Sequence, residues 1–179
     1  MPATHYFTAA DLSAIPGDGN KYEVVHGELL VTPAPRMLHQ LVVGRLMYDL
    51  ASYLKVHHVG EVFPGGDVQF ADDSLVIPDL LLIDLASART LKWSEISLPL
   101  LVVEVLSPSS TRQDRFTKRR LYQEYVVPLY WLVDADAGLV EVWTPEMQFP
   151  VTEQAEIRWH PAGAAEPLVI QLTELFRTP

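Results

Sequence analysis

The stretch LPLLVVEVLSPSS, residues 98–110, decides the fold class of this 179-residue chain. Apolar side chains fill both faces of its first nine residues, and Glu104 is the one charged residue among them. Such a run is typical of a central strand that is covered on both sides. An ionised carboxylate in its middle would lose hydration worth several kcal/mol unless a cation or hydrogen-bond donors replaced the water. Glu104 therefore requires a compensating group.

Asp79 repeats this pattern upstream of Glu104. It stands in IPDLLL, residues 77–82, directly after Pro78, which interrupts regular strand pairing. Two such acids on neighbouring strands would converge on one place, and paired carboxylates select hard divalent cations such as Mg²⁺ or Mn²⁺. The residues alone equally allow that Asp79 and Glu104 are each neutralised by a Lys or Arg in the core.

Apolar periodicity and turn residues on either side of these strands predict a mixed sheet with single helices between groups of strands. We expect helices over 8–15, 35–56 and 112–125. We expect strands over 22–25 and 28–31, joined by a turn at His26-Gly27, and over 61–63, 67–70, 75–83, 98–106, 129–134, 139–143, 156–159 and 168–172. The sequence thus predicts one domain over residues 1–179, of the α/β (α+β) class, with a mixed β-sheet flanked by helices.

Charge is distributed unevenly along the chain. The net charge is −10, yet the segment from Arg112 to Arg120 carries +4. The acidic excess argues against a general nucleic-acid coat protein, whereas the basic segment could contact a phosphate or form only a solvated helix face.

Composition narrows the classes of protein further. The absence of Cys excludes thiolate metal sites and thiol catalysis. No apolar run approaches the roughly 18 residues of a membrane span, and the chain does not begin with a basic region followed by an apolar one. We expect a cytoplasmic protein that does not enter the membrane.

The order of the motifs resembles the Uma family of restriction-endonuclease-like proteins. The resemblance covers about 22–143, through YEVVHGEL (22–29), HQ (39–40), PD (78–79), the strand with Glu104, SPS (107–109), the basic helix and YWLVD (130–134). It implies the PD-(D/E)xK nuclease fold, whose restriction-endonuclease-like core is a helix, a three-stranded meander with the metal-binding acids, a helix and a further strand.

The resemblance assigns roles to particular residues. It implies that Asp79 and Glu104 bind Mg²⁺ (or Mn²⁺). In the nuclease pattern a Lys stands two residues after the second acid, where this chain has Leu106, so Lys118 in the basic helix becomes the displaced catalytic lysine. Asp114 and Lys118 are also spaced for an ordinary helical ion pair on the surface.

Further candidates are less specific. Glu28 matches the Gly-Glu pair of the family, and His39 opens the long helix where a nuclease of this fold often contributes an acid. A His at the start of a helix is otherwise an ordinary surface or hydrogen-bonding residue. Arg112, Arg115 and Arg119 are candidates for gripping phosphates without reading sequence.

The implied function is that of a metal-dependent endonuclease that hydrolyses DNA phosphodiester bonds, and a homodimer would suit the cleavage of two strands. Two alternatives stay open at this point. The chain could be a catalytically silent nucleic-acid-binding protein on the same scaffold, because Leu106 has replaced the usual lysine. It could also be an interaction protein whose buried acids merely pair with Lys or Arg, and whose stability would then not respond to Mg²⁺.

Overall fold

A six-stranded mixed sheet forms the centre of the molecule in the computed structural model, which describes residues 5–96 and 98–179. From one edge to the other it contains β10 (Val151–Glu153), β9 (Leu139–Trp143), β8 (Tyr130–Asp134), β7 (Leu101–Val105), β6 (Leu80–Ile83) and β3 (Glu61–Pro64). β7 and β8 pair in parallel, and the other neighbours are antiparallel. The predicted mixed sheet with a central, fully buried strand at Glu104 is confirmed.

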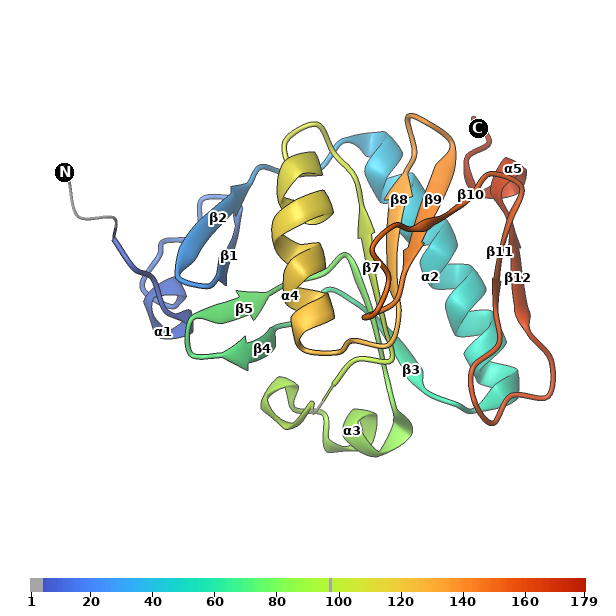
Figure 1. Cartoon of the computed structure of the whole chain (residues 1–179), viewed down its shortest axis with the longest axis horizontal. Coiled ribbons are helices and arrows are strands. Elements are labelled where there is room, and N and C mark those ends of the chain that lie inside the picture. The colour runs from blue at the N-terminus through green and yellow to red at the C-terminus, as the bar shows by residue number, and fades with distance from the viewer. Residues whose placement is uncertain (1–4, 97) are drawn as a thin grey trace.

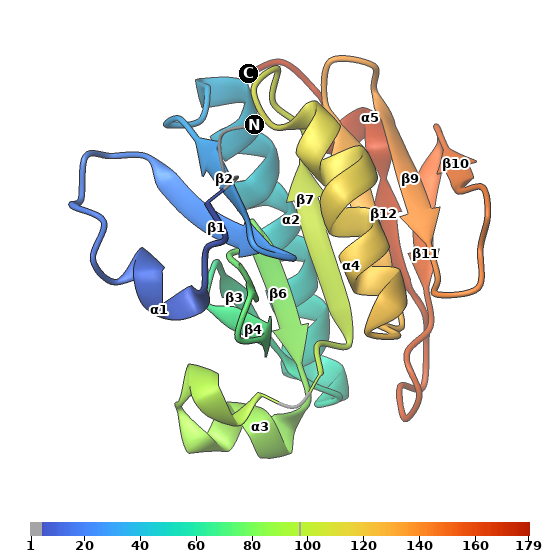
Figure 2. The ribbon, with the colours of Figure 1, turned by 60° about the vertical axis from the view of Figure 1, so that its left-hand side comes forward.

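Both faces of this sheet are covered, as Figures 1 and 2 show. The long helix α2 (Met37–His57), the two-stranded sheet of β11 (Glu156–Trp159) and β12 (Leu168–Gln171), and the short helix α5 (Leu172–Leu175) pack on one face. The other face holds the helix formed by η2 (Gln113–Lys118) and α4 (Arg119–Glu124). A four-stranded antiparallel sheet also packs there, in the order β2 (Glu28–Thr32), β1 (Lys21–Val25), β5 (Ser74–Val76) and β4 (Val68–Ala71).

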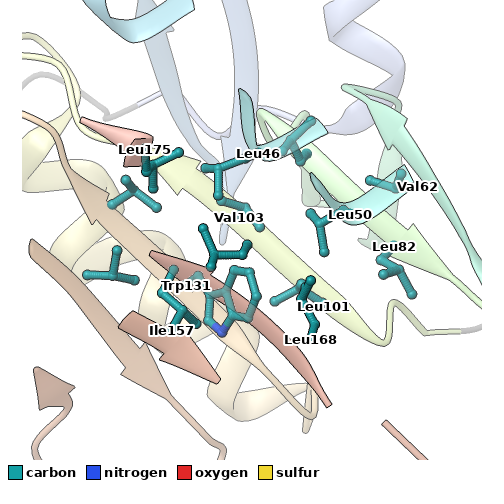
Figure 3. Close-up of a cluster of buried hydrophobic side chains, with 14 of the residues drawn as sticks. Leu46, Leu50, Val62, Leu82, Leu101, Val103, Trp131, Ile157, Leu168 and Leu175 are labelled. Atoms are coloured by element: carbon teal, nitrogen blue, oxygen red, sulfur yellow. The ribbon is translucent and has the colours of Figure 1, made fainter. Parts of the chain in front are cut away.

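Alternation along β7 divides the core into two clusters. Leu101 and Val103 point into the cluster beneath α2, which Figure 3 shows in close-up. Val102 points into the cluster beneath α4. Because successive side chains of a strand alternate between faces, Glu104 lies on the α4 face together with Val102 and Leu106.

The expected continuous strand over 75–83 is wrong. β5 ends at Val76 in the four-stranded sheet, and β6 begins at Leu80 in the six-stranded sheet. Pro78 has no N–H to donate to a strand ladder, and the N–H of Ile77 donates to Glu23 Oε1 at 2.8 Å instead of to a neighbouring strand. The chain therefore crosses between the two sheets at 77–79, and Asp79 lies at this crossing.

Smaller differences concern helices and edges. The first helix is only α1 (Ala9–Leu12), shorter than the expected 8–15, and the basic helix contains the π-helical turns of η2. The sequence interpretation missed α3 (Leu85–Thr90), the 3₁₀ turn η1 (Trp93–Glu95) and β10. Asp84 caps α3 by accepting the N–H groups of Ala86 and Ser87. Within the described ranges no helix is both long and apolar enough to cross a membrane.

Candidate active site

A pocket of about 310 Å³ opens where the chain crosses from the four-stranded to the six-stranded sheet. β1, the start of α2, the crossing at 77–79 and the C-terminal end of β7 all contribute to its lining. Its polar lining residues include Lys21, His39, Asp79, Glu104, Ser107 and Asp114. The pocket thus brings together both acids that the sequence singled out.

Asp79 is held by one of its two carboxylate oxygens. Its Oδ2 accepts the backbone N–H of Val105 at 2.8 Å and lies 3.0 Å from His39 Nε2. Because an ionised carboxylate only accepts hydrogen bonds, His39 donates through Nε2. The other oxygen, Oδ1, has Lys21 Nζ at 3.7 Å and no hydrogen bond within the described part of the chain.

Glu104 is held in the same manner from the helix above it. Its Oε1 accepts the Lys118 ammonium at 3.0 Å and the Tyr122 hydroxyl at 3.1 Å. No hydrogen bond among the described residues involves Oε2. Since Leu80 pairs with Val103 in antiparallel register, Asp79, directly before β6, lies beside Glu104 of β7.

Lys118 lies at the centre of three carboxylates. Its Nζ is 2.8 Å from Glu23 Oε2, 3.0 Å from Glu104 Oε1 and 3.2 Å from Asp114 Oδ1. The side chain is 2% exposed, so the predicted helical pair with Asp114 exists but is buried. The prediction that this pair lies on the surface is wrong, because Glu23 of β1 and Glu104 of β7 both pack against Lys118. The π-helical turn carries Asp114 and Lys118, and such turns are frequent at functional sites.

The charges of this cluster are only partly balanced. Burial, with smaller contributions from Asp114 and Asp79, raises the pKa of Glu104 to about 8 although Lys118 and Lys21 oppose the shift. Burial likewise raises the pKa of Asp114, against the attraction of Lys118. For Lys118 burial alone would lower the pKa, but Glu104, Glu23 and Asp114 outweigh it and hold the pKa well above its usual value.

Asp79 differs from Glu104 in its titration. Burial would raise its pKa, but the hydrogen bond from His39 and the charge of Lys21 outweigh burial and lower the pKa below its usual value. Asp79 is therefore ionised at neutral pH, and Glu104 is the acid of this pair that can hold a proton there.

Two residues of the cluster were missed by the sequence interpretation. Glu23 and Lys21 both stand in β1, whereas the predicted strand over 22–25 contained only Glu23, which is completely buried. A signal was available, because Glu23 is the one acid in YEVV, residues 22–25, and Lys21 is on the same face two residues earlier.

The remaining candidates lie outside the pocket lining. Glu28 is exposed at the start of β2, opposite Val25, so this position adds no support to a catalytic role. Arg112 is exposed. Arg115 pairs with Asp134 at 2.9 Å and also with Glu141. Arg119 lies over the Trp143 ring, 4.7 Å from its centroid. Arg115 and Arg119 are thus engaged within the molecule.

The donor set available for a cation consists of carboxylate oxygens. Within residues 5–96 and 98–179, no group of three or more His, Cys, Asp or Glu side chains is arranged so that it could hold a metal ion. Asp79, directly before β6, and Glu104, in β7, remain as a pair of oxygen donors that line the same pocket.

Comparison with known proteins agrees with this fold. A crystal structure of a putative nuclease belonging to DUF820 from Anabaena variabilis ATCC 29413 superposes with a TM-score of 0.73. It is 22% identical, and the alignment covers 95% of this chain and 97% of that one. No curated protein sequence matches. The family model Uma2, described as "Putative restriction endonuclease", matches residues 9–170. The chain therefore belongs to the Uma2 putative restriction endonuclease family, as the motif order predicted.

Proposed function

We propose that this protein is an endonuclease that hydrolyses DNA phosphodiester bonds with Mg²⁺ or Mn²⁺ held by Asp79 and Glu104. One observation carries the proposal. Each acid has one oxygen fixed by protein donors and a second oxygen without a hydrogen bond among the described residues, and both acids line the same pocket.

The charge of the cluster fits a divalent cation. Within the described part of the chain, the ammonium groups of Lys21 and Lys118 face four carboxylates, those of Glu23, Asp79, Glu104 and Asp114. With all four acids ionised, this cluster carries an excess of two negative charges. Mg²⁺ is usually bound by one or two carboxylates and completes its shell with water and substrate phosphate. A divalent cation would therefore neutralise the cluster without any further protein ligand.

Each residue of the proposed site has a distinct part. A bound ion would supply a water of lowered pKa and would stabilise the charge that develops on the phosphoryl group. His39 and the Val105 N–H orient Asp79. Lys118 and Tyr122 hold Glu104 by Oε1, so Lys118 serves as the displaced lysine by positioning the second acid. That Lys118 also orients the attacking water stays a prediction.

Nucleic acid is the substrate class that the family description implies, and DNA is our proposal within it. Exposed Arg112 is the best placed of the three predicted arginines to contact a flanking phosphate. Arg115 and Arg119 would first have to leave their internal partners. The homodimer and the cytoplasmic location stay predictions.

Cleavage of supercoiled plasmid tests the proposal. Purified protein is assayed with Mg²⁺, with Mn²⁺ and with chelator, beside the variants Asp79→Asn and Glu104→Gln. Glu61→Gln, at an exposed position that begins β3, is the matched control. Metal-dependent nicking that both site variants lose and the control retains is expected. Nicking that survives in both site variants would refute the assignment.

A catalytically silent nucleic-acid-binding protein remains the second candidate. It is favoured by the burial of Leu106 in the apolar cluster beneath α4, which leaves the usual lysine position without a polar group. Binding of an oligonucleotide that depends on Mg²⁺ and on Asp79, without nicking of any DNA, would support this candidate over the endonuclease.

A further inference from the structure

We propose that Lys21 of β1, and not Lys118, is the residue that contacts the substrate phosphate. This inference rests on the proposed function and adds to it a residue for recognition of the scissile phosphate. The two lysines share the acidic cluster but differ in exposure and in hydrogen bonding.

Lys118 is buried among carboxylates and does not face the pocket. Its Nζ donates a hydrogen bond to Glu104 Oε1 and forms ion pairs with Glu23 Oε2 and Asp114 Oδ1 within 3.2 Å. The side chain is 2% exposed, and it is not among the residues that line the pocket. A phosphate in the pocket would therefore not meet this ammonium.

Lys21 has the opposite character. Its side chain is 25% exposed and lines the pocket. Its one hydrogen bond within the described residues goes to the Ile77 carbonyl at 3.0 Å. The nearest carboxylate oxygens, Asp79 Oδ1 and Glu23 Oε2, lie at 3.7 and 3.9 Å, beyond hydrogen-bond distance. Two of its three N–H donors thus remain available.

The position of Lys21 also favours an anion. It is the one Lys or Arg among the pocket-lining residues, so the cation that a phosphate meets in this pocket, other than a metal ion, is Lys21. The carboxylate oxygen nearest to its ammonium is Asp79 Oδ1, the oxygen that we propose as a ligand of the metal ion. β1 pairs with β2 at five successive positions, beginning with Lys21 opposite Thr32, and this pairing fixes the backbone that carries the ammonium.

Binding and turnover together test the inference. The probe is a 5′-phosphorylated thymidine dinucleotide, titrated by calorimetry with Mg²⁺ and with Ca²⁺, beside plasmid nicking. The variants are Lys21→Met, Lys21→Arg and Lys118→Met. Lys55→Met, at an exposed position of α2, removes the same charge away from the pocket and is the control. Thermal unfolding of each variant shows whether it is folded.

We expect Lys21→Met to weaken dinucleotide binding and to raise KM for DNA at least tenfold, the usual scale of one charge-assisted hydrogen bond. Lys21→Arg should recover part of the loss, and Lys55→Met should bind as the wild type does. Binding and KM that are unchanged in folded Lys21→Met would overturn the inference, even if the wild type cleaves DNA. Absence of dinucleotide binding by the wild type would overturn it as well. Lys21-dependent binding without nicking would support the phosphate site while removing the endonuclease proposal.

Discussion

The raised pKa of Glu104 makes the stability of the metal-free protein depend on pH. Its pKa is about 8 in the folded protein and 4.5 in a solvated carboxyl, chiefly because of burial. Between these values the folded state holds a proton that the unfolded state has released. The free energy of unfolding therefore falls by ~1.4 kcal/mol for each pH unit across this window.

Over the whole window this effect amounts to about 5 kcal/mol, a large part of the ~5–15 kcal/mol that stabilises a typical domain. Asp114 shifts in the same direction as Glu104 and adds to the fall. Asp79 has a lowered pKa. Its contribution to the free energy of unfolding changes with pH only below the usual pKa of an aspartate, so it is constant across this window. Lys118 has a raised pKa, so its contribution is lost only at pH values above the usual lysine pKa.

The perturbation is Glu104→Gln, which keeps the shape of the side chain and removes its titration. Urea denaturation in chelator, at several pH values from about 5 to about 8, gives the free energy of unfolding of each protein. We expect the wild type to lose several kcal/mol more than Glu104→Gln across this range, so that the variant is the more stable protein at the alkaline end. Glu61→Gln should follow the wild type. Equal slopes for wild type and Glu104→Gln would refute the reasoning, because they would mean that Glu104 titrates normally in the fold.

Three further outcomes are expected from the same cluster. Saturating Mg²⁺, at ~100 times its Kd, should stabilise the wild type by ~2.7 kcal/mol in thermal unfolding and leave Asp79→Asn unaffected. The stabilisation by Mg²⁺ should grow from acidic pH to pH 8, because the ion must displace the Glu104 proton. Lys118→Met should destabilise the fold by ~3–5 kcal/mol in urea denaturation, since it leaves three carboxylates buried together, and a loss below ~1 kcal/mol would contradict this view of the cluster. Tyr122→Phe should cost ~1–2 kcal/mol at a pH above the pKa of Glu104, where the hydroxyl donates to an ionised carboxylate, and less at acidic pH. An equal cost at both pH values would exclude that dependence.

The sequence predicted the central part of the fold because the signals there are local. Strand β7 shows apolar residues on both faces, and α2 shows apolar residues every three or four positions, so periodicity alone identifies both. The two acids were identifiable because a carboxylate inside an apolar run requires a partner wherever the run folds. Short elements carry no such periodic signal. Strand β10 has only three residues, largely exposed, and it depends on its pairing with β9.

The family resemblance named Lys118 and His39 as site residues, but periodicity could not predict which groups contact each acid, because those contacts depend on how separate segments meet. The sequence around Lys118 would also fit a helix on the surface. Lys118 is buried among Glu23, Glu104 and Asp114 because β1 and β7 pack against the helix. Lys21 lies 58 residues from Asp79 in the chain, and the two meet only because the four-stranded sheet packs on the α4 face.

The crossing at 77–79 explains why the site lies at this place in the fold. Regular pairing would have satisfied the backbone there with neighbouring strands, but Pro78 prevents it and the chain changes sheets. Glu23 Oε1 then accepts the N–H of Ile77, and the Lys21 ammonium donates to the carbonyl of the same residue. The side chains that secure the crossing are thus neighbours of Asp79. Loss of Glu23 would accordingly disturb Lys118 and the backbone before Asp79 together, so β1 supports both proposed metal-binding acids although it belongs to the other sheet.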